Sequence, residues 1–153
     1  MTESSPFPEI GAELRQSIDA ALPKLRKKSE AQAAEPRAPG KWSPKQVIGH
    51  LIDSASNNHQ RFVRAQQVTA LSFPPYEQES WVGLQHYDKR SWEDLIALWH
   101  AYNLHLSHVI SRIPESKRQV PCTIESNTPI TLGFLASDYV AHLRHHLAQV
   151  DAL

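Results

Sequence analysis

The sequence predicts an all-α protein, a four-helix bundle with long connections between the second and third helices and between the third and fourth. Four segments carry apolar residues every three or four positions, which is the spacing of one buried helix stripe. Each stripe must be buried against a partner, which favours a closed bundle over an open array. A chain of 153 residues has the usual size of one domain, so residues 1–153 are expected to form a single bundle domain.

The first predicted helix runs from Ile10 to Leu25, where apolar residues recur at helical intervals. Pro23 lies inside this pattern. It is expected to kink the helix or to end it one turn early, because proline lacks an amide donor and clashes with the preceding turn. Residues 31–41 combine two prolines and a glycine and show no apolar period, so they are predicted to be a connection.

The second helix has a clear predicted start. Ser43 is its N-cap, Pro44 takes the first helical position, where a missing amide costs little, and Gln46 completes a capping box. The apolar period continues through Val63 and gives way near Thr69 to a long stretch with two adjacent prolines. This stretch is expected to be an irregular connection.

The third helix is predicted to begin after Ser91 and to end at Pro114, with a near-heptad apolar stripe between them. Residues 115–130 have short alternating apolar positions, which fit a loop or a small hairpin. The fourth helix is expected to run from about Thr131 to the C-terminus.

Composition and charge argue against several classes of function. Lysine plus arginine equals aspartate plus glutamate, 16 against 16, so no basic surface for a nucleic acid is expected. No apolar run approaches the roughly 20 residues that span a bilayer, and membrane insertion is not expected. The N-terminal residues lack the features of a secretory signal, and the single cysteine, Cys122, cannot form an intramolecular disulfide. A cytoplasmic location is therefore expected.

Histidine is the residue type that points to chemistry. The chain has nine histidines against one methionine and one cysteine, so any metal site would use imidazole and carboxylate ligands. His142 and His146 are four residues apart in the last helix, which places them one turn from each other on one face. His146 lies within the apolar arc of that helix, His142 at its edge and His145 on the polar side. The pair alone is a weak motif, and the alternative is that both residues face solvent near a helix end.

A third ligand would come from the second helix, where the alternatives are His50 and His59. On the helical wheel His59 lies with the apolar residues. His50 belongs to a flanking polar stripe, which also contains Ser54, Asn57 and Arg61. The wheel therefore favours His59, whose alternative role is that of a core-edge histidine hydrogen-bonded to a neighbour. The histidines expected to be solvated or in loops, without a constellation, are His86, His100, His105 and His108.

A resemblance to a known family rests on three segments, which are WSPKQVIGHLIDSASNNHQRF at 42–62, PYEQESW at 75–81 and DYVAHLRHHLAQV at 138–150. Together they resemble the DinB-like (DinB/YfiT) superfamily of metal-binding bundles, and the resemblance covers nearly the whole chain. It implies that His50, His142 and His146 hold one divalent ion between the second and fourth helices, which replaces the wheel-based choice of His59. The name of the superfamily does not imply DNA binding.

The resemblance also implies a metal-dependent enzyme that acts on a small molecule. Family members include enzymes that transfer low-molecular-weight thiols such as bacillithiol or mycothiol, and others described only as metal-dependent hydrolases. Three neutral imidazoles leave zinc, or alternatively nickel or manganese, an open position at which a bound water or thiol becomes a nucleophile. Thiol S-transfer is the first expectation. The alternatives are hydrolysis of a small substrate and a non-catalytic metal-binding helical dimer.

Several polar residues are candidates for supporting roles. A ligating imidazole usually donates its second nitrogen to a carboxylate or a carbonyl. The candidates by position near the ligands are Asp53, Asp138 and Gln149, whose alternative is an ordinary surface role. Asn103 interrupts the apolar stripe of the third helix and must find hydrogen bonds if it is buried.

Four aromatic residues complete the expectations. Tyr76 and Trp81 lie in the long connection, where they are expected to cover the pocket, because long connections in compact domains are often functional. Trp92 and Tyr102 are expected to exceed what one core can bury. Together with the resemblance they favour a homodimer. Because Cys122 is expected to have no function, a transferase would need an external thiol.

Overall fold

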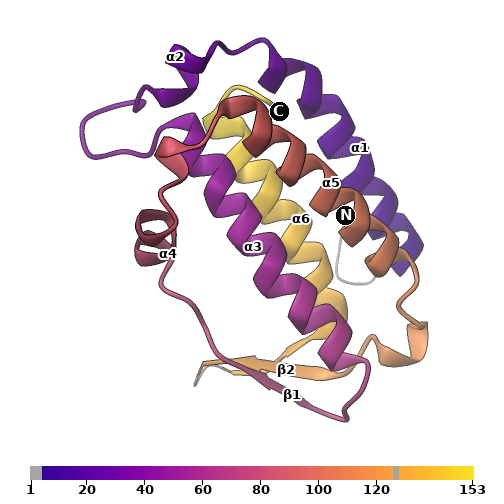
Figure 1. Ribbon diagram of the computed structural model, residues 1–153. Helices are drawn as coiled ribbons and strands as arrows, with labels where there is room; N and C mark the ends of the chain where they lie inside the picture. The colour runs from indigo at the N-terminus through magenta and orange to yellow at the C-terminus, as the bar shows by residue number, and fades with distance from the viewer. Residues whose placement is uncertain (1–4, 126–127) are drawn as a thin grey trace.

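The computed structural model describes residues 5–125 and 128–153. Four long helices form a bundle (Figure 1), and they are α1 (Phe7–Arg26), α3 (Pro44–Ala65), α5 (Trp92–Ser111) and α6 (Leu132–Gln149). Helix α1 packs mainly on α5, while α3 packs on both α5 and α6. The predicted all-α four-helix bundle is confirmed. No helix in the described part of the chain is long and apolar enough to cross a membrane.

Shorter elements lie in the connections. They are α2 (Glu30–Ala34), β1 (Leu71–Phe73), α4 (Gln78–Leu84), η1 (Tyr87–Lys89), η2 (Glu115–Lys117), β2 (Pro121–Ile124) and β3 (Ile130–Thr131), where η denotes a 3-10 helix. Strand β2 pairs in parallel with β1 and antiparallel with β3, forming a small sheet at one end of the bundle (Figure 1). The small hairpin considered for residues 115–130 is thus present as β2 and β3, although residues 126 and 127 lie outside the described residues.

The start of α3 has the expected cap, and α5 and α6 also begin with capping residues. The Ser43 hydroxyl accepts the backbone N–H of Gln46 at 3.3 Å, and the Gln46 side chain accepts the backbone N–H of Ser43 at 2.9 Å. The hydroxyls of Ser91 and Thr131 accept backbone N–H groups in the first turns of α5 and α6. Each cap satisfies a donor that the helix itself leaves unpaired, so these boundaries follow from local sequence.

The first helix extends further than expected. It continues through Pro23 to Arg26, so the expectation that the proline ends it one turn early is wrong. Leu25 lies beyond the proline and is fully buried. Because Pro23 lies in the last turn, only one backbone hydrogen bond is lost, and burial of Leu25 offsets that loss.

Two short helices were not expected in the connections. Helix α2 lies at the start of the 31–41 stretch, where Ser29 and Gln32 form a second capping box. Helix α4 lies in the connection after α3. Each buries a single side chain, Ala33 in α2 and Val82 in α4. A helix that buries one residue has no apolar period to detect.

The core is one apolar cluster to which all four long helices contribute. Trp92, expected at the surface, is only 4% exposed, and its indole N–H donates to the carbonyl oxygen of Leu25 at 2.9 Å. Tyr102 is half-buried, and its hydroxyl lies 2.9 Å from Nδ1 of His59. Both aromatic residues are therefore used within the bundle. The expectation that one core cannot bury them is wrong.

Candidate metal centre

Three histidines from two helices converge inside the bundle. His50 lies in the second turn of α3 and is fully buried, and His142 and His146 lie on successive turns of α6. The Nε2 atoms of His50 and His142 are 3.2 Å apart. One ligand atom from each of the three residues lies within 4.8 Å of the other two. The structure therefore brings together the three histidines that the resemblance implies as ligands.

Packing and the contact of Nε2 with His142 hold the ring of His50. Its centroid lies 5.0 Å from that of Trp42. The neighbouring residue, Gly49, lies under Tyr87, and a Cβ at this glycine would be 2.2 Å from a carbon of the tyrosine ring. Nδ1 of His50 is buried, and no described group hydrogen-bonds to it. The ring is thus fixed by its packed surroundings, with Nε2 directed at His142.

Burial keeps the three imidazoles neutral. Desolvation, with smaller contributions from His146 and His142, lowers the pKa of His50 to about 3. Desolvation and the neighbouring histidines lower the pKa of His142 to about 4. Desolvation also lowers the pKa of His146, although its hydrogen bond to Gln149 acts in the opposite direction. A neutral imidazole is the form that binds a metal ion.

The geometry of the cluster fits a divalent ion with four ligands. Zinc–nitrogen bonds of about 2.0–2.1 Å place two nitrogens of a tetrahedral site about 3.3 Å apart. The Nε2 atoms of His50 and His142 have nearly this separation, at 3.2 Å. Within residues 5–125 and 128–153, no carboxylate, cysteine or fourth histidine joins the cluster. Three protein ligands would leave a position open to water or a substrate.

Gln149 contacts one member of the cluster directly. Its Oε1 lies 2.8 Å from Nδ1 of His146. Because the amide oxygen can only accept, Nδ1 carries the proton and Nε2 presents its lone pair to the cluster. Of the supporting residues considered from the sequence, Gln149 is the one placed beside a ligand in this way.

Asp53 has different partners from those expected. One of its carboxylate oxygens accepts hydrogen bonds from the Tyr87 hydroxyl and the Gln85 amide, each at 2.7 Å. Burial raises the pKa of Asp53, while these hydrogen bonds lower it. Asp53 therefore fixes η1 and the end of α4 against α3, and it does not hydrogen-bond to His50.

Asn103 is buried in the bundle away from the cluster. Its amide N–H donates to the carbonyl oxygen of Trp99 at 2.9 Å, and its side-chain oxygen accepts the hydroxyl of Tyr139. A buried Asn103 thus finds the hydrogen bonds that it requires. Asp138 is exposed on α6, one turn before His142, and desolvation raises its pKa.

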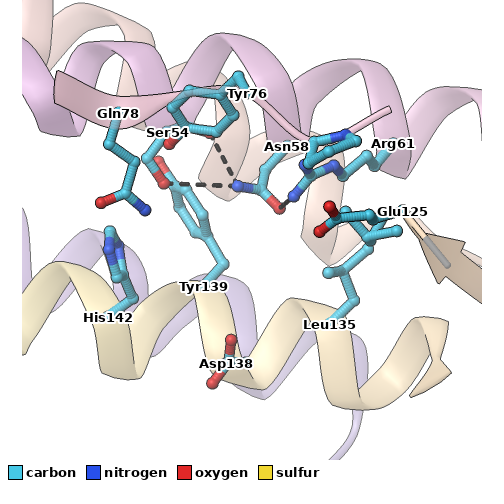
Figure 2. A pocket seen from close by; sticks show the side chains of 12 residues that line it. Ser54, Asn58, Arg61, Tyr76, Gln78, Glu125, Leu135, Asp138, Tyr139 and His142 are labelled. Atoms are coloured by element: carbon cyan, nitrogen blue, oxygen red, sulfur yellow. Dashed lines mark hydrogen bonds between the residues drawn. The ribbon is translucent and has the colours of Figure 1, made fainter. Parts of the chain in front are cut away.

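A cavity of about 300 Å³ extends from His142 along the groove between α3 and α6 (Figure 2). Its lining includes Ser54, Asn58 and Arg61 from α3, and Leu135, Asp138 and Tyr139 from α6. Tyr76 and Gln78 cover it from the connection, and Gln78 extends toward His142 in Figure 2. The ring of Trp81 packs at a tilt against that of Tyr76, with centroids 5.2 Å apart, but Trp81 does not line this cavity. A second cavity, of about 240 Å³, lies at His146 and Gln149.

The sequence places two residues of the cavity wall in a polar stripe but assigns them no function. The polar stripe that contains His50 also contains Ser54 and Arg61, and both line the cavity. Asn57, the other member, donates instead to the carbonyl oxygen of Asp53 at 2.9 Å. Asn58 was missed. A polar stripe inside an otherwise buried helix was the signal that could have found this wall.

The other histidines lie outside the cluster. His59 contacts the hydroxyl of Tyr102, so the structure places it as a core-edge histidine with a neighbour. His100 is not simply solvated, because its Nε2 lies 3.0 Å from a carboxylate oxygen of Asp19. The ring of His105 packs against that of His59, with centroids 5.2 Å apart.

Comparison with known proteins identifies the family of this chain and two relatives. The model of the DinB superfamily matches residues 13–150. A Bacillus subtilis (strain 168) protein named "Putative metal-dependent hydrolase YfiT" is 23% identical over 146 residues, which cover 95% of this chain and 78% of that protein. A Bacillus cereus (strain ATCC 10987 / NRS 248) protein named "Putative metal-dependent hydrolase" is 28% identical over 138 residues, covering 81% of this chain and 71% of its own.

A solved structure has the same fold. It is that of YfiT from Bacillus subtilis, described as "a probable metal-dependent hydrolase with an unusual four-helix bundle topology". The two chains superpose with a TM-score of 0.74 at 22% identity, over 95% of this chain and 79% of the other. The four long helices and their order therefore belong to a known bundle topology.

Proposed function

This chain belongs to the DinB superfamily, and on that basis we propose that it is a metal-dependent enzyme whose divalent ion is held by His50, His142 and His146. The observation that carries the proposal is the convergence of three neutral imidazoles without a fourth protein ligand among the described residues. A structural zinc site would be closed by four protein ligands, whereas a catalytic site keeps a position open. Both relatives compared above carry names that describe metal-dependent proteins.

Zinc is the first candidate for the metal, with nickel or manganese as alternatives. An all-imidazole ligand set suits zinc and nickel, and manganese accepts it when water fills the remaining positions. The chemistry that a bound divalent ion supplies is a lowered pKa of a coordinated water or thiol, which yields an anionic nucleophile at neutral pH. Because the three imidazoles are neutral, they leave the positive charge of the site uncompensated. Gln149 holds the proton of His146 on Nδ1, away from the ligand position.

The reaction that we propose first is S-transfer from a low-molecular-weight thiol such as bacillithiol or mycothiol. The thiolate sulfur attacks an electrophilic carbon, the leaving group departs with its bonding electrons, and the thiol proton passes to solvent. The sulfur must be external, because Cys122 is buried and desolvation raises the pKa of its thiol. Hydrolysis of a small substrate is the alternative. It is supported by the names of the relatives and uses water in place of the thiol.

An activity screen with metal removal tests the proposal. Protein without a histidine tag is assayed with several thiols and 1-chloro-2,4-dinitrobenzene, and separately with p-nitrophenyl acetate. Chelation should abolish turnover, and zinc, nickel or manganese should restore it to different extents. Product that forms only with thiol identifies a transferase, and product that forms with water alone identifies a hydrolase. Unchanged turnover in protein shown to be metal-free would contradict the metal-dependent mechanism and leave a structural role for the metal. No turnover with any thiol or with water would favour a non-catalytic metal-binding dimer.

We further propose that residues 1–153 form one domain, which is supported by the single core cluster. The homodimer also stays a proposal, now supported by exposed apolar side chains such as Leu84 and Leu98 rather than by Trp92. Sedimentation at micromolar concentration should give twice the chain mass. A single 17.3 kDa species would contradict the dimer. A cytoplasmic location stays a prediction from the sequence.

A further inference from the structure

Arg61 is a buried cation without an anion. Its exposure is only 8%. One terminal N–H donates weakly to Asn58 at 3.4 Å, and the guanidinium lies 5.4 Å from the centre of the Phe73 ring. No described carboxylate forms an ion pair with it, and no described group accepts from its buried Nε. An arginine keeps its charge when it is buried, so this arrangement is costly unless an anion compensates it.

Arg61 lies at the end of the 300 Å³ cavity that is remote from the histidine cluster (Figure 2). His50 and Arg61 are separated by about 16 Å along the axis of α3, from the rise of 1.5 Å per residue. Ser54 and Asn58 line the cavity between them. The cavity therefore has a metal-site end at His142 and a cationic end at Arg61.

Within the part of the chain that the structure describes, neither carboxylate at the cavity of Arg61 pairs with the arginine, and the second cavity contains no comparable buried cation. Glu125 and Asp138 line the cavity of Arg61, but both are exposed and neither forms an ion pair with the arginine among the described residues. The cations of the second cavity, Arg37 and Lys41, are exposed to solvent. Arg61 is thus the one buried arginine that the described residues place at a cavity beside the histidine cluster.

We propose that the substrate is an elongated small molecule whose carboxylate binds Arg61 while its reacting end lies at His142. This inference rests on the proposed function, since it assigns a substrate class to the same site. The planar guanidinium matches a carboxylate through two parallel N–H···O bonds. Tyr76 and Tyr139 lie between His142 and Arg61 in Figure 2, and Leu135 lines the cavity near Arg61, so the cavity suits an apolar body. The substrate is therefore an aryl or alkyl carboxylic acid with its reactive group far from the acid.

A matched pair of probes tests the inference on zinc-loaded protein. 4-Phenylbutyrate and 4-phenylbutyramide have nearly the same shape, but only the first carries a charge. Calorimetry should show that wild-type protein binds the acid about tenfold or more tightly than the amide, the scale of a charge-assisted hydrogen bond. In nitrogen-15 spectra the acid should shift the side-chain Nε–H resonance of Arg61, and the amide should not.

Variants locate the effect. Arg61→Gln should abolish the preference for the acid, and Arg61→Lys should retain part of it. Arg64→Gln, which removes an exposed arginine from the same helix, should leave the preference unchanged. Equal binding of acid and amide by wild-type protein, or a preference that survives Arg61→Gln, would overturn the inference. If Arg61→Gln fails to fold, the shift of the Arg61 Nε–H resonance and the comparison in His142→Ala below still decide.

A last comparison separates this inference from the proposed function. The acid preference is measured again in His142→Ala, where a metal-bound carboxylate cannot be its source. If the preference persists there, Arg61 is its origin. If no metal binds even to wild-type protein, the proposed function fails while the binding of the acid at Arg61 can still be measured. If zinc binds normally and no preference exists, only the inference fails.

Discussion

The Nε2 atoms of His50 and His142 lie 3.2 Å apart, although 92 residues separate the two histidines along the chain. Both rings are desolvated enough that their pKa values fall to about 3 and about 4. Two neutral imidazoles share one proton in a direct hydrogen bond, and the third ring, His146, has its proton fixed by Gln149. Three nitrogens that converge in this way are best satisfied by a cation between them.

The contact between Gln149 and His146 predicts that Gln149→Leu weakens metal binding. Without the amide oxygen, Nδ1 of His146 loses its hydrogen-bond acceptor. Gln149 then no longer selects the tautomer of the ring or holds its orientation. Loss of such a partner typically lowers metal affinity about 10–100-fold. Competition with a chromogenic chelator measures the change. Gln60→Leu, at an exposed position of α3, is the control, and equal affinity in the two variants would refute the role of Gln149.

The lowered pKa values predict how the metal-free protein responds to pH. Histidine in the unfolded chain titrates near 6.5, whereas His50 and His142 in the folded chain remain neutral to about 3 and about 4. Between these values the unfolded state binds more protons. The free energy of unfolding should therefore fall as the pH falls from about 6.5 towards 4.

Urea unfolding of metal-free protein at a series of pH values measures this slope. His142→Ala should show a shallower slope, and His108→Ala, exposed on α5, should match the wild type. Identical slopes in all three proteins would show that the buried imidazoles are not the cause. Turnover should also fall on acidification, because protons compete with the metal for the same nitrogens.

Replacement by alanine should have opposite effects on stability at Gly49, which is closely packed, and at Gly83, which is not. At Gly49 a Cβ would lie 2.2 Å from the ring of Tyr87, whose hydroxyl donates to Asp53 at 2.7 Å. Gly49→Ala must displace that ring and should lower the free energy of unfolding by about 1–3 kcal/mol. Gly83 lies in α4 with nothing within 4 Å, so Gly83→Ala should raise it by up to about 1 kcal/mol. Denaturant midpoints of both variants and the wild type measure these changes. A Gly49→Ala variant as stable as the wild type would show that Tyr87 is free to move.

The starts of α3, α5 and α6 could be predicted from the sequence because their causes are local. Ser43 and Gln46 cap α3 within four residues of each other, and no distant contact is needed. The short elements could not be predicted, because each depends on a single buried residue. Val82 in α4 is an example. Strand β1 depends on pairing with β2, 50 residues later, which no local pattern encodes.

The choice between His50 and His59 shows a limit of the helical wheel. The wheel treats a polar stripe as a solvent-facing surface, and it therefore placed His50 with Ser54 and Arg61 outside the core. In the structure His50 is fully buried, and Ser54 and Arg61 of this stripe line the cavity between α3 and α6. Only the resemblance to a family, or the position of α6, could distinguish a polar face that lines a site from one that meets water.

The most direct measurement is the metal content of protein prepared without a histidine tag, for the wild type and for five single variants. One divalent ion per chain is expected in the wild type, His59→Ala and His145→Ala. His50→Ala, His142→Ala and His146→Ala should each lose stoichiometric binding. Full occupancy in His50→Ala together with loss in His59→Ala would contradict this account.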